Sequence, residues 1–416
     1  MAPPRPRPRR PAPDPRRARR DAAARRRAAV RRRSAIAILL LAAVVLALRA
    51  ASQGDPGAPG AVAGARAAAP KRPAPPIEIA WVGDTTLGSS RGLPPANAST
   101  MLAGVQGQLG GDLVLGNLEG TFGTGGATKC PATTKSATCF AFQAPPQNAA
   151  ALRAAGFDLV SLANNHAWDA GGAGMAQTTR ALDAAGVRYN GRPGEITLLR
   201  TRGRTVAVVG FAAYPWASPI NDPAAIRSFV GEAAAKADTV VVTFHAGAEG
   251  AGAQRTPAGM ETAYGEQRGD VRAFARTAID AGADLVLGAG PHVLRGMEVY
   301  RDRLIAYSLG NFAGYDNFSV HGPMALSGIL RVRLAPDGRA IGGRLVPLRL
   351  VGKGLPEPDP ARIAIDRVAS LSAADFGAAA VPIDPEGRLL GDARGHVDPT
   401  TTVDPPAATT SGSPAR

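Results

Sequence analysis

One stretch of this chain, residues 161–170, has the sequence Ser161-Leu162-Ala163-Asn164-Asn165-His166-Ala167-Trp168-Asp169-Ala170. It follows the short apolar run from Phe157 to Val160, which predicts a buried strand, and it precedes a helical pattern that starts with two glycines. Two amides, an imidazole and a carboxylate therefore share one strand-to-helix loop. Ligands of α/β proteins usually bind at the carboxyl ends of strands, but Asn and Asp in such a loop can equally cap the next helix.

Four other predicted strands run into polar residues in the same manner. Residues 77–82 precede Asp84, residues 113–116 precede Asn117 and Glu119, residues 238–244 precede His245 and Glu249, and residues 284–287 precede His292. Three of the chain's five histidines lie at such ends. Because strand ends in one sheet lie side by side, we expect these side chains to converge on one pocket.

The positive charge of the chain is concentrated at its N-terminus. The formal net charge is +15, of which residues 1–33 carry +12 from 14 Arg and 2 Asp, leaving +3 for all later residues. A nucleic-acid partner would require a basic face on the folded part of the chain, so the charge distribution gives no case for one. The length of 416 residues allows one large domain or two ordinary ones.

The N-terminal part predicts a membrane anchor. Residues 1–33 are rich in Pro and Arg and are expected to form a disordered cytoplasmic tail. Residues 34–52 contain a continuous apolar run and are expected to form a single transmembrane signal anchor, with the arginines holding the N-terminus in the cytoplasm. A cleaved signal peptide is the alternative, because the run is short and small residues follow it. Both interpretations place the domain outside the cytoplasm, and we expect it to be extracellular.

The rest of the chain is expected to form one α/β domain between flexible segments. Residues 53–76 have the composition of a Pro/Ala/Gly linker. Across residues 77–352, strands alternate with helices that are followed by Gly156, Gly186 and Gly282, and the later part is rich in strands. Residues 353–395 are expected to be a loosely structured extension of the domain, and residues 396–416 a disordered tail.

Cys130 and Cys139 are the only cysteines. In a chain exported from the cytoplasm, two close cysteines are most simply a disulfide that closes a surface loop.

The polar residues at the strand ends are oxygen and nitrogen donors without a thiolate. The set comprises Asp84, Glu119, Asn165, His166, His245, Glu249 and His292. Such donors suit one or two divalent ions of Mn, Zn or Fe bound for hydrolysis, rather than a structural zinc. A Ser-His-Asp hydrolase is the weaker alternative. His321 and His396 lie outside the pattern and are interpreted as surface residues.

Several motifs, taken in order, resemble the capsule synthesis proteins of the CapA type, which are implicated in poly-γ-glutamate capsule production and whose domain is similar to the metallophosphatase (calcineurin-like) fold. The resemblance covers about residues 77–350. The motifs are Gly83-Asp84, Gly116-Asn117-Leu118-Glu119-Gly120, Asn164-Asn165-His166 with Asp169, His245-Ala246-Gly247-Ala248-Glu249, Pro291-His292-Val293-Leu294 and Tyr307-Ser308-Leu309-Gly310-Asn311-Phe312.

The resemblance implies an α/β fold, a four-layer α-β-β-α sandwich with its site at the strand ends. It implies metal ligands at Asp84, Glu119, Asn165, His245 and His292. His166, with Asp169, looks like the catalytic acid that protonates a leaving group. Asn117, Asn164, Glu249 and Asn311 look like residues that support the ligands or contact substrate.

The chain departs from the metallophosphatase pattern at several positions. Thr86 and Gly290, the latter beside Ala289, stand where metallophosphatases usually have histidines. Ala246 stands where capsule-family members often have Trp, and Glu119 stands where other phosphatases have Asp. Each metal position could therefore lack one ligand, which favours a single or weakly held ion.

Two functions follow from the resemblance. The first is a membrane-anchored protein that acts with other membrane proteins in capsule or poly-γ-glutamate synthesis or export and binds an anionic polymer. The second is an active metal-dependent phosphoesterase that acts on a cell-envelope substrate. A pure binding module is a third class, and it predicts no bound metal.

Overall fold

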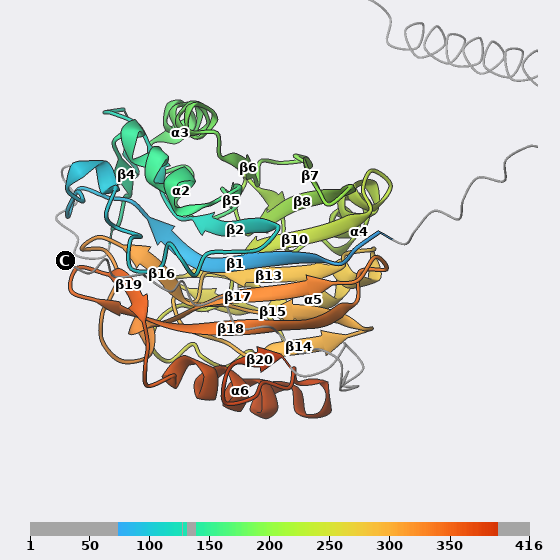
Figure 1. Ribbon diagram of the computed structural model, residues 1–416. Helices are drawn as coiled ribbons and strands as arrows, with labels where there is room; N and C mark the ends of the chain where they lie inside the picture. The colour runs from blue at the N-terminus through green and yellow to red at the C-terminus, as the bar shows by residue number, and fades with distance from the viewer. Residues whose placement is uncertain (1–73, 127, 131–138, 390–416) are drawn as a thin grey trace, which may run out of the picture. The chain divides into compact units, whose positions relative to one another are not determined.

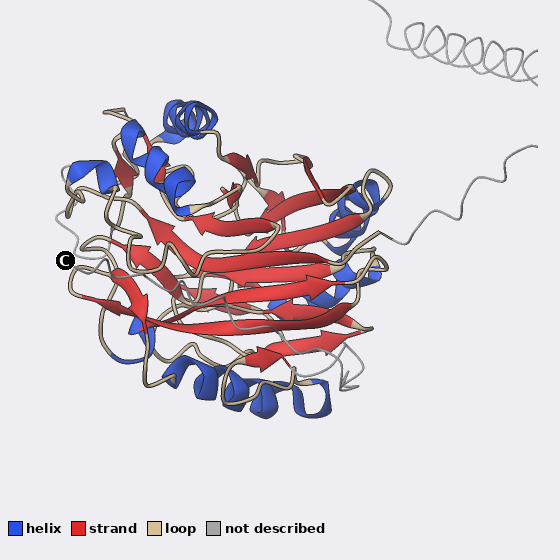
Figure 2. Ribbon diagram, viewed as in Figure 1, coloured by secondary structure: helices blue, strands red, loops and turns tan. Residues whose placement is uncertain are grey.

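The computed structural model describes residues 74–126, 128–130 and 139–389, which form two mixed β-sheets with helices outside them (Figures 1 and 2). The first sheet contains β1 (Ile77–Thr86), β2 (Leu113–Leu118), β5 (Leu159–Ser161), β6 (Arg188–Asn190), β16 (Asn311–Gly314), β17 (Leu326–Leu334), β18 (Ala340–Val351), β19 (Leu355–Pro358) and β20 (Arg388–Leu389). Its strand order is β19-β18-β17-β1-β2-β5-β6, with β16 beside β1 and β20 beside β18.

The second sheet has the strand order β14-β15-β13-β10-β8-β7, with β9 beside β8. Its strands are β7 (Thr197–Thr201), β8 (Arg204–Ala212), β9 (Ser218–Pro219), β10 (Thr239–His245), β13 (Leu285–Ala289), β14 (Met297–Tyr300) and β15 (Arg303–Ala306). Two small pairs complete the strands, β3 (Thr121–Phe122) with β4 (Gln143–Ala144), and β11 (Glu261–Ala263) with β12 (Glu266–Gly269). In both sheets the central strands run parallel, so several carboxyl ends lie together.

The α-helices are α2 (Ala149–Ala155), α3 (Gly171–Ala185), α4 (Pro223–Ala234), α5 (Val271–Asp280) and α6 (Ile363–Phe376). Short 3₁₀ turns occur at η1 (Ala96–Ala98), η2 (Pro146–Asn148), η3 (Gly322–Ala325) and η4 (Gly377–Ala379). Glycines in the left-handed region end α2 and α3, at Gly156 (φ 103°) and Gly186 (φ 72°). Asp222 and Asp270 cap α4 and α5 by accepting hydrogen bonds from backbone N–H groups of the first turn.

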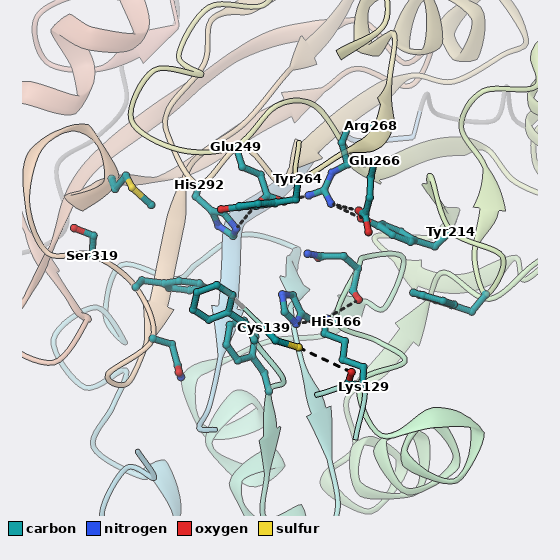
Figure 3. Close-up of a pocket in the computed structure, with 17 residues that line it drawn as sticks. Lys129, Cys139, His166, Tyr214, Glu249, Tyr264, Glu266, Arg268, His292 and Ser319 are labelled. Carbon is teal, nitrogen blue, oxygen red and sulfur yellow. Dashed lines mark hydrogen bonds and ion pairs between the residues drawn. The ribbon is translucent and has the colours of Figure 1, made fainter. Parts of the chain in front are cut away.

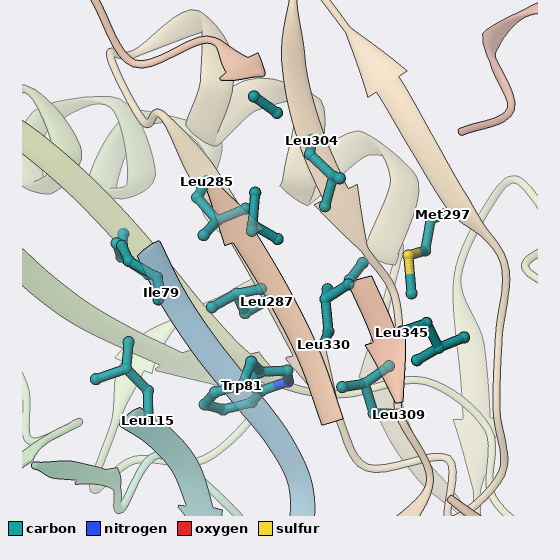
Figure 4. Close-up of a cluster of buried hydrophobic side chains, with 14 of the residues drawn as sticks. Ile79, Trp81, Leu115, Leu285, Leu287, Met297, Leu304, Leu309, Leu330 and Leu345 are labelled. Carbon is teal, nitrogen blue, oxygen red and sulfur yellow. The ribbon is translucent and has the colours of Figure 1, made fainter. Parts of the chain in front are cut away.

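The two sheets pack face to face over one apolar core (Figure 4). Alternate residues of β1 enter this core, including Ile79 and Trp81, and they meet Leu285 and Leu287 of β13. The Trp81 indole also donates across the interface to the carbonyl of Gly288, 3.2 Å away. The intervening β1 residues pack with α2 and α3, while α4 and α5 pack on the outer face of the second sheet. The layers are therefore helix, sheet, sheet and helix.

The structure confirms the mixed α/β architecture and corrects the expectation for residues 353–395. Residues 353–389, the part of this range that the structure describes, do not form a loose extension, because they include the helix α6. Ala364, Ile365 and Val368 of α6 are buried in the core between the sheets, and α6 contacts β14 of one sheet as well as β17 and β18 of the other. An apolar stripe spaced by three and four residues explains this docking.

The sequence analysis also missed the central strand β8 and the helix α4. The expected tail, anchor and linker lie outside the described residues, apart from positions 74–76, and the expected C-terminal tail lies outside them too. Among the residues that are described, no helix is long and apolar enough to cross a membrane. Cys130 and Cys139 form the expected disulfide.

Candidate metal centre

The carboxyl ends of strands from both sheets bring the predicted polar residues together. Asp84 lies near the end of β1, where it is level with Asn117 of β2 and Asn311 of β16. His245 is the last residue of β10, and it is level with Ala289 of β13. His292 follows β13 after a short turn. Side chains from both sheets therefore lie together at the carboxyl ends of these strands.

A close backbone approach places Asp84. A Cβ atom at Gly83 would overlap the carbonyl oxygen of Gly310, and Asp84 N donates to that same oxygen at 3.0 Å. The pairing of β1 with β16 and with β2 shifts register at Asp84. Such irregularities in a strand re-aim a side chain, and here the carboxylate of Asp84 lies beside His245 and His292.

Asp84, Glu119 and His292 form a compact group in which one ligand atom from each residue lies within 4.8 Å of the others. His292 Nδ1 is 3.2 Å from Asp84 Oδ2, and His292 Nε2 is 3.6 Å from Glu119 Oε1. His245 joins the same group, with Nδ1 3.5 Å from Asp84 Oδ1 and Nε2 3.6 Å from Glu119 Oε1. Both carboxylates are fully buried.

Burial and mutual charge shift the pKa of every member of this group. Burial opposes ionisation of Asp84, but hydrogen bonds and charges from His245 and His292 outweigh it and hold its pKa well below the usual range. Burial raises the pKa of Glu119 to about 8 and lowers the pKa of His245 to about 4. Burial disfavours the His292 cation, yet Glu119 and Asp84 raise its pKa to about 9. Such clustered shifts are typical of functional sites.

Several atoms of the group are buried without a hydrogen-bond partner. They are both carboxylate oxygens of Glu119, Nε2 of His245 and Oδ1 of Asn165. Buried polar atoms normally have a hydrogen-bond partner, and atoms that serve as ligands of an ion are one exception. Carboxylate, amide-oxygen and imidazole donors are ligands that Mn²⁺, Zn²⁺ and Fe²⁺ accept. The residues present therefore fit a divalent metal ion.

The neighbouring amides and Glu249 surround the predicted ligands. Asn117 Nδ2 donates to Asp84 Oδ1 at 2.8 Å, and Asn164 Nδ2 donates to Asn117 Oδ1 at 3.1 Å. Asn311 Oδ1 lies 2.8 Å from His292 Nδ1 and accepts a hydrogen bond from it, so in the neutral ring Nε2 is the atom free to bind a metal ion. Glu249 Oε2 is 3.7 Å from that Nε2.

His166 and Asp169 form a hydrogen-bonded pair beside this group. His166 Nδ1 is 2.7 Å from Asp169 Oδ2, so in the neutral ring the proton belongs on Nδ1. Nε2 then faces the centre, 3.8 Å from Glu119 Oε1. Burial lowers the pKa of His166 to about 4. Asn165, the preceding residue, lines the cavity described below.

The departures from the metallophosphatase pattern have local explanations. Thr86 Oγ1 donates to the carbonyl of Gly88 at 3.4 Å. Gly290 has φ 114°, and a Cβ atom there would lie 2.9 Å from both backbone N and O of Ala246, so the position cannot take a histidine without rearrangement. Its backbone N–H instead lies 3.3 Å from Asp84 Oδ2 and donates to it.

A cavity of about 350 Å³ opens above the group and has walls that the sequence analysis did not identify (Figure 3). Its aromatic lining residues are Phe140, Phe142, Tyr214, Trp216, Tyr264 and Phe318. Lys129 and Arg268 are its cations: Lys129 pairs with Asp169, and Arg268 pairs with Glu249 and Glu266. Lys129 lies beside Cys130 and Phe140 beside Cys139, which was the only sequence signal for the cavity walls. Tyr214, Trp216 and Tyr264 lie on segments away from the motifs.

The fold and these residues define an α/β sandwich with a candidate metal centre at the strand ends. The sequence family described as "Bacterial capsule synthesis protein PGA_cap" matches residues 78–316. The chain belongs to this family of bacterial capsule synthesis proteins.

Curated relatives agree with the family assignment. The "PGA biosynthesis protein CapA" of Bacillus subtilis (strain 168) is 34% identical over 39% of this chain and 43% of its own length. The "Capsule biosynthesis protein CapA" of Bacillus anthracis is 30% identical over 52% of this chain and 54% of its own. A "Probable polyglutamine synthesis accessory protein" of Mycobacterium tuberculosis is 28% identical over 58% and 65%. The chain therefore spans about half the length of the first two relatives.

Solved structures give only a distant likeness. The Haemophilus influenzae NAD nucleotidase (NadN) superposes with a TM-score of 0.36 and 13% identity, over 73% of this chain and 57% of that one. A putative 5'-nucleotidase from Staphylococcus aureus superposes with the same TM-score and 12% identity, over 68% of this chain and 54% of the other. A likeness of this size bears on neither the fold nor the function.

Proposed function

We propose that this chain is a membrane-anchored, extracytoplasmic protein that acts in capsule or poly-γ-glutamate synthesis or export through a metal site. The family assignment supports the process, since the two CapA relatives carry the names of PGA and capsule biosynthesis proteins. One observation carries the metal site, namely the two buried, unpartnered oxygens of Glu119 between three imidazole rings. The proposed fold type is the four-layer metallophosphatase sandwich, which the order of the layers supports.

In this proposal Asp84, Glu119, His245 and His292 hold the ion, and Asn165 adds its amide oxygen. A bound divalent ion would polarise a phosphoryl or carbonyl oxygen and lower the pKa of a bound water. The chain itself orients the ligands, through Asn117 on Asp84 and Asn311 on His292. Asp169 fixes the tautomer of His166, whose Nε2 then accepts a proton or, once protonated, donates one.

Elemental analysis of the purified full-length protein tests the metal site. We expect about one divalent ion per chain, lost in both Asp84→Asn and His292→Gln, because ligands that converge on one site depend on each other. His321→Gln is the matched control, since His321 is exposed and lies outside the group. Equal metal content in wild type and both ligand variants would contradict the proposal.

The proposed location is the cell membrane, with one anchor at residues 34–52, the N-terminus in the cytoplasm and the domain outside. The apolar run between an arginine-rich segment and a Pro/Ala/Gly segment supports it. The proposed partners are other polymer-synthesis membrane proteins and an anionic polymer. Protease added to intact cells should remove the domain and leave a short protected fragment; a chain that survives until the cells are lysed would refute this location.

The second candidate function is that of an active metal-dependent phosphoesterase on an envelope substrate. The His166–Asp169 pair favours it, because an imidazole with a fixed tautomer faces the ligand group. Turnover of p-nitrophenyl phosphate with Mn²⁺ should be lost in His166→Ala and kept in His321→Ala. A protein that binds metal but shows no turnover under any condition would exclude the phosphoesterase function. Only the assembly or binding function would then remain.

A further inference from the structure

Two short segments flank the Cys130–Cys139 disulfide, and we call them its arms: Lys129 before Cys130, and residues 139–142. Both arms contact the His166–Asp169 pair. On the first arm, Lys129 directly precedes Cys130. Its Nζ lies 2.6 Å from Asp169 Oδ1 and 3.1 Å from His166 Nδ1, and its backbone N donates to the Asp169 carbonyl at 3.0 Å. Lys129 thus holds Asp169 by both side chain and backbone.

The second arm continues from Cys139 to Phe142. The backbone N of Phe142 donates to Asp169 Oδ2 at 2.6 Å, the same oxygen that accepts from His166 Nδ1. The Phe142 ring stacks on the His166 imidazole, with centroids 4.1 Å apart and planes 21° apart. Cys139 Sγ also lies 3.9 Å from the Lys129 carbonyl, so the two arms are in contact with each other near His166 (Figure 3).

These contacts fix the imidazole on its face and on one edge. Phe142 covers the face of the His166 ring, while Asp169 binds Nδ1 and is itself held by Lys129 and by Phe142 N. Only the Nε2 edge is left to face Glu119. Charge-assisted hydrogen bonds of this kind are among the stronger and more directional contacts in proteins.

We propose that Lys129 and the Cys130–Cys139 disulfide form a strap, together with Phe142, that positions His166 against the ligand group. Lys129 is a positioning residue in this proposal, since it acts through Asp169. The strap is complete only where the disulfide forms, so the site is assembled in an oxidising compartment and loosened when the cysteines are reduced. The proposal deepens the role given above to His166, but the positioning itself does not depend on turnover.

Modification by diethyl pyrocarbonate, located by mass spectrometry, measures how well His166 is held without requiring activity. The full-length wild type is compared with Cys130→Ser/Cys139→Ser, Lys129→Met and Lys129→Arg. Loss of a hydrogen bond to a charged group should raise the rate at His166 about tenfold in the first two variants. Lys129→Arg should restore the slow rate, because arginine keeps the cation beside Asp169.

Two controls separate positioning from general loosening. Lys236→Met removes an exposed lysine that pairs with Glu232 on α4, and it should leave His166 at the wild-type rate. Exposed His321 should react equally in all variants, and neither buried His245 nor His292, whose side chain is 13% exposed, should change its rate. An unchanged rate at His166 in the serine and methionine variants would overturn the proposal. A rate that rises equally at His166, His245 and His292 would also overturn it, because the strap would then stabilise the whole domain rather than His166. Metal content, measured on the same samples, reports separately on the proposed function.

Discussion

Asn117 donates its side-chain amide to Asp84 Oδ1 at 2.8 Å, and the same nitrogen lies 3.1 Å from His245 Nδ1. Its amide oxygen in turn accepts from Asn164 Nδ2. A single side chain on β2 thereby orients one proposed ligand from each sheet. The interface between the sheets and the metal centre are linked through this amide.

Replacing Asn117 by Leu should lower the affinity for Mn²⁺ about 10- to 100-fold, because supporting hydrogen bonds orient the ligands of a metal. Isothermal titration of the metal-stripped protein measures the affinity. Asn221→Leu is the control, since Asn221 is exposed and precedes α4. If Asn117→Leu bound the ion as tightly as the wild type, Asp84 and His245 would not need this orientation.

Glu119→Leu should stabilise the metal-free protein and remove its response to metal. Both oxygens of Glu119 are buried without a hydrogen-bond partner, so a leucine avoids a desolvation cost of about 1–3 kcal/mol. Thermal unfolding of the metal-free variant should therefore occur at a higher temperature than that of the metal-free wild type. Added Mn²⁺ should raise the transition of the wild type only, since binding to the native state is what stabilises it. A variant whose metal-free form melts earlier would show that Glu119 contributes to the fold.

Much of the site could be predicted from the sequence because the relevant signal is local. A short apolar run that leads to Asp84, His245 or His292 marks a strand and its terminus together. Parallel pairing aligns such termini within each sheet, with Asp84 in the first sheet and His245 and His292 in the second. The caps at Gly156 and Gly186 were equally visible, since a left-handed residue after a helix favours glycine.

Other parts could not be predicted because they depend on contacts between distant segments. Arg268 enters the cavity from the β12 strand, and nothing in its neighbourhood distinguishes it from a surface arginine. The helix α6 was missed because its apolar stripe follows loop-like sequence. Its contribution to the core depends on packing between the two sheets, which are built from distant segments. Lys129 gains a role only when the disulfide arms meet at Asp169.

Metal affinity should increase with pH between neutral and mildly alkaline conditions. The pKa of Glu119 is raised to about 8 and that of His292 to about 9, so this pair of groups retains protons in the metal-free protein near neutrality. A bound ion must displace these protons, so the apparent association constant should rise by up to about two log units per pH unit below the lower pKa and level off above the higher one. Titrations in buffers of different ionisation enthalpy measure the protons released. A constant affinity across this range would show that neither group loses a proton on binding.

The buried ion pair of Arg295 and Glu261 should be important for stability. Arg295 donates to both oxygens of Glu261, at 2.9 and 2.6 Å, and the side chains are only 1% and 4% exposed. Arg295→Met should lower the free energy of unfolding by about 3–5 kcal/mol, because it leaves the Glu261 carboxylate buried and unpaired. Urea denaturation checks the value.

Two comparisons make that test specific. The double variant Arg295→Met/Glu261→Leu should recover most of the lost stability, since no charge is then left buried. Arg301→Met breaks an exposed pair with Asp280 and should cost less than about 1 kcal/mol. Equal losses in Arg295→Met and in the double variant would mean that the guanidinium matters for its bonds to the Ala253 and Ala248 carbonyls instead.

The helix α6 offers a matched pair of isoleucines for measuring how far it is part of the core. Ile365 is 1% exposed and packs between the two sheets, whereas Ile363, two positions earlier on the same helix, is 48% exposed. Ile365→Ala should lower the free energy of unfolding by about 3 kcal/mol, because it removes buried methyl groups and leaves a cavity at the sheet interface. Ile363→Ala should have little effect, and the two variants share the same change in helix propensity. If both variants lost stability equally, the cost would come from the helix itself, and α6 would be an accessory to the sandwich. A large loss in Ile365→Ala alone would instead show that a domain ending at residue 352 lacks part of its core.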